Sequence, residues 1–130
     1  MQVIVDNIKH IDFFSYLFHI NTQAKIYHLQ SDKYEHHIVL GEFYDELTGI
    51  TDSLIETMQG KLRKKLRGYK SYSFKEDNSI LEFLSNCLDE VIKYKKELKK
   101  YEGTYDNIIN QIQTLQDLVE QCIYKITFLP

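Results

Sequence analysis

The residues of this chain that could bind a metal ion gather between positions 28 and 56. Their side chains are imidazoles and carboxylates, from His28, His36, His37, Asp45, Asp52 and Glu56. These two ligand types together suit divalent cations of the hard and borderline classes, with iron among them. A metal site is therefore the most specific chemistry that the sequence offers.

The segment that holds these residues has the pattern of one long helix, which we expect to end at about Leu62. Its apolar residues recur at three- and four-residue intervals, at Leu40, Phe43, Leu47, Ile50 and Leu54. Because each residue turns a helix by about 100°, Asp45, Asp52 and Glu56 fall on the face opposite this stripe. Asp52 and Glu56 are one turn apart and could bind one cation together. Since they face away from the core, a second subunit would have to complete the site.

A simpler interpretation of the same acids is that they only keep an exposed helix face in contact with water. His36 falls on the core side of the helix, where we expect it to pack. His10 and His19 lie earlier in the chain, and we expect them to be exposed or hydrogen-bonded rather than to bind metal. The Glu-x-x-His motif of diiron bundles is absent from this helix and from the last one.

A preceding helix is predicted from Ile8 to Leu29. Its apolar stripe consists of Phe13, Leu17, Ile20, Ala24 and Tyr27. Ser31 or Asp32 can cap the long helix that follows, and Glu35 is placed to complete a capping box. The turn between the two helices is therefore short, which makes them an antiparallel pair.

A second pair of helices is predicted after a cap at Asn78 or Ser79, with Gly103 between them. Their apolar stripes are Leu81, Leu84, Leu88, Val91 and Leu98 in the third helix, and Tyr105, Ile108, Ile112, Leu115, Val119, Cys122, Ile126 and Leu129 in the fourth. Five glycines and one proline, the last residue, leave few turns for a β-fold. The sequence predicts one all-α domain over residues 1–130, an antiparallel four-helix bundle.

Charge and cysteine content narrow the class of protein. A formal charge of −3 argues against a general nucleic-acid binder, and we expect the basic runs at 61–70 and 93–100 to be solvated helix ends, the first ending near Gly68. DNA binding is therefore not expected. Cys87 and Cys122 are far apart and predict buried, reduced thiols. Without a secretory signal or a membrane span, we expect a cytoplasmic protein with no membrane partner.

The arrangement of the candidate ligands resembles the Dps branch of the ferritin-like superfamily. The resemblance rests on His28, on the run Tyr-Glu-His-His that ends at His37, and on Asp52-Ser-Leu-Ile-Glu56. Members of that branch have a histidine that ends the first helix, a second histidine early in the next helix, and an Asp-x-x-x-Glu pair fifteen residues further on. The third and fourth helices match only as a hydrophobic pattern.

This resemblance implies a ferritin-like bundle that oxidises Fe²⁺ with peroxide or oxygen and stores ferric iron in a hollow homo-oligomer of about 12 subunits. It implies that His28 and His37 of one subunit and Asp52 and Glu56 of its neighbour hold the iron at a two-fold interface. The family has an acid four residues after the second histidine. Here that residue is Gly41, and Asp45 is the acid that could substitute.

Two alternatives use the same helices without iron chemistry. One is a non-catalytic bundle of ferritin-like descent, of a kind that a phage could encode, whose outer helix face serves oligomerisation or partner binding. Two departures from the Dps branch favour it: a first turn about three residues shorter than is usual there, and Gly41 in place of the acid. The other is an interaction module that forms an extended coiled coil.

Overall fold

The computed structural model describes residues 6–77, 79–101 and 103–130, and this part of the chain is all-helical. The helices are α1 (Asn7–Gln30), α2 (Tyr34–Leu62), α3 (Ile80–Lys99) and α4 (Asp106–Phe128). The prediction of four helices packed in a bundle is confirmed, and the predicted end of the second helix at Leu62 is correct. None of the described helices has the length and apolarity to cross a membrane.

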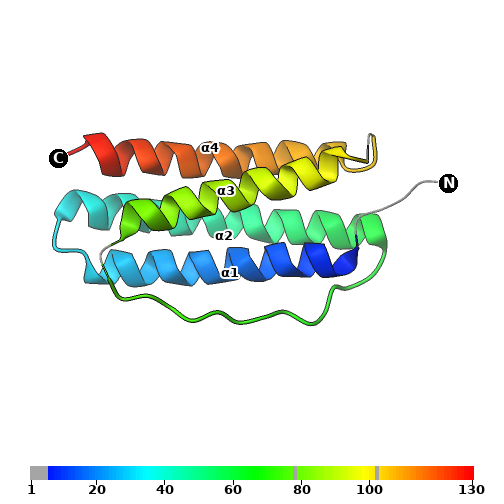
Figure 1. The fold of residues 1–130 in the computed structure, drawn as a ribbon, viewed down its shortest axis with the longest axis horizontal. Coiled ribbons are helices and arrows are strands. Elements are labelled where there is room, and N and C mark those ends of the chain that lie inside the picture. Colours follow the sequence, from blue (N-terminus) through cyan, green and yellow to red (C-terminus); the bar gives the residue numbers. More distant parts are fainter. Residues whose placement is uncertain (1–5, 78, 102) are drawn as a thin grey trace.

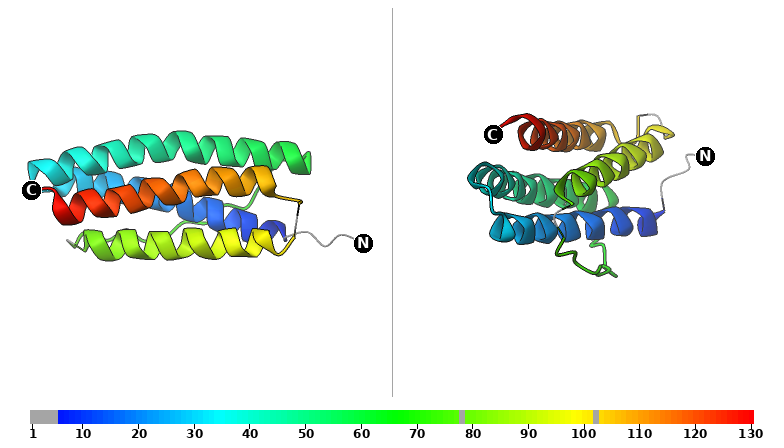
Figure 2. Two further views of the ribbon diagram at one scale, coloured as in Figure 1. Left: turned by 90° about the horizontal axis from the view of Figure 1, so that it is seen from above. Right: turned by 60° about the vertical axis from the view of Figure 1, so that its left-hand side comes forward.

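The helices form two antiparallel pairs joined by one long connection (Figure 1). A short turn joins α1 to α2, and another joins α3 to α4. Residues 63–77 return along the whole bundle, so that α2 and α3 run in the same direction. Helix α2 packs against α1 and α4, and α4 packs against α3, whereas α1 and α3 have few contacts (Figure 2). The bundle is therefore tightly closed on three sides and looser on the fourth.

The core consists of the predicted apolar stripes, and nearly all of their members are buried. All five stripe residues of α1 are buried, as are Leu40, Phe43, Leu47 and Leu54 of α2. Leu81 and Leu129 are exposed instead, because each lies at the end of its helix. Both cysteines are buried and unpaired, as predicted, and burial raises the pKa of Cys122 to about 12.

The predicted cap of the second helix is wrong. Lys33, not Ser31 or Asp32, precedes the first turn of α2, and its side chain caps nothing. Ser31 instead ends α1, and its hydroxyl donates to the Lys33 carbonyl at 3.0 Å and accepts from the Lys33 N–H at 3.3 Å. A side chain engaged in this turn cannot cap the next helix, so the predicted capping box with Glu35 does not form.

The cap of the third helix is Ser79, while Asn78, the other candidate, lies outside the described residues. The Ser79 hydroxyl does not bond to the first turn of α3. It donates to a carboxylate oxygen of Asp77 at 2.6 Å, which keeps the end of the long connection close to the helix that it enters.

The basic run at 61–70 holds the end of α2, as predicted, but only its first two residues are helical. The helix stops at Leu62, and Arg63 has left-handed backbone angles (φ 55°, ψ 39°). From there the chain lies along the outer side of α1 (Figure 2). The Gln23 amide accepts from the Lys75 N–H and donates to the Lys75 carbonyl, both at 2.7 Å, and Ser15 accepts from the Lys70 N–H at 2.9 Å. Polar side chains of α1 thus replace the backbone partners that a helix would supply.

Candidate metal centre

Two of the predicted ligands meet at the turn between α1 and α2. His28 lies in the last turn of α1 and His37 in the first turns of α2. Their rings stack, with centroids 3.8 Å apart and planes 17° from parallel. Both residues are partly buried, so the pair is held by protein on one side and still reaches the surface.

Each imidazole of this pair is fixed by the backbone of the other residue. His28 Nδ1 donates to the His37 carbonyl at 2.5 Å, and His37 Nδ1 donates to the His28 carbonyl at 2.9 Å. A carbonyl oxygen can only accept, so both Nδ1 atoms must carry the proton in this arrangement. Each neutral ring then has its lone pair on Nε2, and no described residue donates a hydrogen bond to either Nε2. Histidine ligands in metal sites are commonly oriented in this way.

Three residues that the sequence analysis did not single out support the pair. The Tyr44 ring meets the His28 ring edge to face, with centroids 5.4 Å apart. Asn21 of α1 donates to the Tyr44 carbonyl and to the Thr48 hydroxyl, both at 2.9 Å, and so ties α1 to α2 about two to three turns from the histidine pair. No spacing rule finds such residues, because their role depends on how two helices face each other.

Asp45, Asp52 and Glu56 are all exposed on α2, on the face that the sequence predicted. Asp52 follows His37 by fifteen residues, which is about 22 Å along a helix. The acid pair and the histidine pair of one copy therefore cannot share an ion. Among the described residues, no group of three or more histidine, cysteine or acidic side chains lies close enough to hold a metal ion. Within one copy the predicted ligands form two separated halves.

The other histidines have different surroundings. His10 is fully buried, and its Nδ1 is hydrogen-bonded to the Tyr94 hydroxyl at 2.5 Å. Burial lowers the pKa of His10 to about 4, so the ring is neutral at pH 7. His19 stacks on Phe74 of the long connection, with centroids 5.2 Å apart. His36 is only partly buried, so the prediction that it packs in the core holds only in part.

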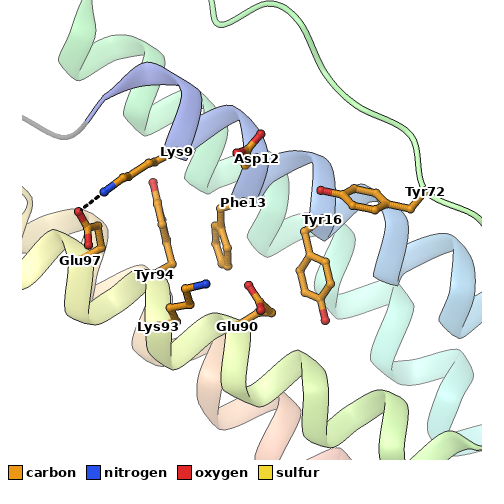
Figure 3. Close-up of a pocket in the computed structure, with 9 residues that line it drawn as sticks. All are labelled: Lys9, Asp12, Phe13, Tyr16, Tyr72, Glu90, Lys93, Tyr94 and Glu97. Atoms are coloured by element: carbon orange, nitrogen blue, oxygen red, sulfur yellow. Dashed lines mark hydrogen bonds and ion pairs between the residues drawn. The ribbon is translucent and has the colours of Figure 1, made fainter.

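A cavity of about 500 Å³ opens between α1 and α3, where these helices have few contacts (Figure 3). Phe13 and Tyr94 stack in its wall with centroids 4.1 Å apart, and the Lys9–Glu97 ion pair, at 2.6 Å, joins the helices at one end. None of the predicted metal ligands lines this cavity. It is a consequence of the loose fourth side of the bundle and is separate from the histidine pair.

The sequence profile of a family of unknown function (DUF5856) matches residues 28–126, which is more than half of the chain. The matched range contains both histidines of the stacked pair and all three exposed acids. No curated protein and no solved structure matches the chain.

Proposed function

The chain belongs to the DUF5856 family, and for this member we propose a Dps-like function: binding and oxidation of Fe²⁺ at sites between subunits, with storage of ferric iron in a hollow oligomer. The observation that supports it most is the reciprocal bonding of His28 and His37. Two imidazoles with both Nδ1 atoms occupied by backbone carbonyls offer Nε2 lone pairs. That donor set suits iron and other borderline divalent ions.

The course of the chain is a second, weaker support. Two antiparallel helix pairs joined by one full-length connection are the arrangement of ferritin-like bundles. Many bundles share it, so the topology agrees with the proposal without deciding the chemistry.

In the proposed site, His28 and His37 of one copy and Asp52 and Glu56 of a neighbouring copy hold the iron. The exposed position of the acids leaves them accessible to a second copy. Two Fe²⁺ ions each give one electron to one molecule of hydrogen peroxide, whose O–O bond breaks to form two hydroxide ions. The carboxylates favour the product, because their attraction to the metal rises with its charge.

Mixing the purified protein with Fe²⁺ and peroxide tests this function. We expect ferric absorbance to develop faster than in a protein-free control, and a solution mass of many subunits. Replacing Asp52 and Glu56 by Ala should abolish the enhancement and leave the helix content unchanged, because both side chains lie outside the core. No ferric absorbance above the control would defeat the proposal.

A non-catalytic bundle that acts in oligomerisation or partner binding is the second candidate. The observation that favours it is the exposure of three apolar side chains, each about 70% exposed: Leu29 and Tyr34 at the α1–α2 turn and Phe128 at the end of α4. An assembly that forms in solution but neither binds nor oxidises iron would select this function. The extended coiled coil is not the arrangement of the structure, since the four helices fold against each other.

A further inference from the structure

Of the three glycines in α2, Gly41 is the one where a side chain would collide with a neighbouring residue. A Cβ atom built on it would lie 2.9 Å from His28 Cε1 and 3.1 Å from His28 Nδ1. Carbon atoms do not approach so closely without displacement. At Gly49 and Gly60, the other glycines of α2, a Cβ would meet nothing within 4 Å. Glycine inside a helix costs about 1 kcal/mol relative to alanine, and of the three glycines of α2 only Gly41 has a neighbour, the His28 ring, that excludes a Cβ atom.

The His28 ring has little freedom to avoid a side chain at position 41. It is stacked on His37, bonded through Nδ1 to the His37 carbonyl, and in contact with the edge of Tyr44. A displacement of the ring would break these contacts together. The observed position of His28 and a side chain at position 41 therefore exclude each other.

Gly41 also lies one helical turn after His37, where a side chain would be a neighbour of the His37 ring. A carboxylate there would add an oxygen ligand beside the two imidazoles. In this chain the His28 ring occupies the space that a side chain at position 41 would fill. One residue thus determines both where His28 lies and how many oxygen ligands the site can have.

We propose that Gly41 is a positioning residue that seats His28 against His37 and so presents the Nε2 atoms of the two stacked rings as separate nitrogen donors to divalent ions that prefer imidazole. The inference rests on the proposed function, because it concerns the same site. Imidazole suits ions such as Co²⁺, Zn²⁺ and Fe²⁺, whereas sites built from oxygen ligands suit Mg²⁺, Ca²⁺ and Mn²⁺. Two imidazole donors and no oxygen ligand at position 41 favour the ions of the first class.

The test compares Gly41→Ala and Gly41→Asp with Gly60→Ala, a matched control on the same helix with open space around it. Nitrogen NMR of the metal-free proteins reports the histidine tautomers, and calorimetric titration gives the affinities for Co²⁺ and Mn²⁺. In the natural protein and in Gly60→Ala we expect Nδ1-protonated rings at positions 28 and 37, and Co²⁺ bound at least tenfold more tightly than Mn²⁺.

Gly41→Ala should change the His28 resonances and weaken Co²⁺ binding by about 10- to 100-fold, as the loss of ligand orientation does in other metal sites. Gly41→Asp should in addition narrow the ratio of Co²⁺ to Mn²⁺ affinity. The inference is overturned if Gly41→Ala behaves like Gly60→Ala, or if the natural protein binds Co²⁺ no more tightly than Mn²⁺. A protein that shows the Gly41-dependent Co²⁺ preference but oxidises no Fe²⁺ refutes the proposed function and leaves this inference standing.

Discussion

Histidines at the two ends of α1 have the same hydrogen-bonded atom and opposite surroundings. His10, near the start, and His28, near the end, are both bonded through Nδ1. His10 is sealed among Phe14, Tyr94 and Tyr105, whereas His28 shares a partly exposed stack with another imidazole. Bonding fixes a ring in both places. Access to the second ring nitrogen separates a histidine that stabilises the fold from one that could bind an ion.

The largest expected effect is on stability and comes from His10. Replacing His10 by Ala leaves a cavity and removes the partner of the buried Tyr94 hydroxyl, so we expect a loss of about 3 kcal/mol in the free energy of unfolding. Urea denaturation measures it. The double variant His10→Phe with Tyr94→Phe removes both polar groups and should cost less than about 1.5 kcal/mol. A cost below about 1 kcal/mol for His10→Ala would show that the ring is not a core residue.

We also expect the titration of His10 to make the free energy of unfolding depend on pH. Its pKa is about 4 in the folded protein and 6.5 in the unfolded chain, so the unfolded chain binds more protons between these values. His10 therefore contributes stability at pH 7 that is lost as the pH falls through 6.5 towards 4, by about 3 kcal/mol. Urea denaturation at several pH values should show this slope in the natural protein and a weaker one in the His10→Phe, Tyr94→Phe variant. Equal slopes would contradict the assignment.

Changes at His28 and His37 should affect iron oxidation strongly and stability little, the reverse of what is expected at His10. Replacing His28 or His37 by Ala should slow the oxidation of Fe²⁺ at least tenfold, because each removes a nitrogen ligand. The free energy of unfolding should fall by only about 1 kcal/mol, since the rings are partly exposed and their bonds are to the backbone. His10→Ala, assayed at a temperature where it stays folded, serves as the control and should oxidise iron normally. A large loss of stability without loss of iron oxidation would show that His28 and His37 stabilise the fold and do not bind iron.

The smallest expected effect concerns Gly49, which lies on the exposed face of α2 between Asp45 and Asp52. A Cβ atom there meets nothing, so Gly49→Ala should stabilise one copy by about 0.5–1 kcal/mol through helix propensity alone. Thermal unfolding of dilute protein measures it. Destabilisation would show that position 49 is covered in solution, contrary to an open face.

The helices could be predicted because their determinants are local. The apolar stripe of α2 predicts the helix as far as Leu54, and the same stripe turns Asp52 and Glu56 outward. The course of the connection after Leu62 could not be predicted. Its basic residues resemble a helix end, but Gln23 and Ser15, more than 50 residues earlier in the chain, hold it in an extended form.

The candidate site could also be predicted only in part. The spacing of His28 and His37 brought the two rings to one turn, where they meet. The sequence shows Gly41 only as a departure from the acid that the resemblance leads one to expect, whereas the structure shows that an added Cβ would collide with the His28 ring. Such a role depends on the approach of two helices, which no pattern within one helix encodes.

The central claim, that one copy supplies the histidines and another the acids, is tested most directly by complementation. A His28→Ala, His37→Ala protein and an Asp52→Ala, Glu56→Ala protein should each fail to oxidise iron. When both are co-expressed in one assembly, a mixed two-fold interface contains one intact site and one site without ligands. Random mixing should then restore about a quarter of the natural activity. No recovery in mixed assemblies of confirmed composition would contradict a site shared between copies.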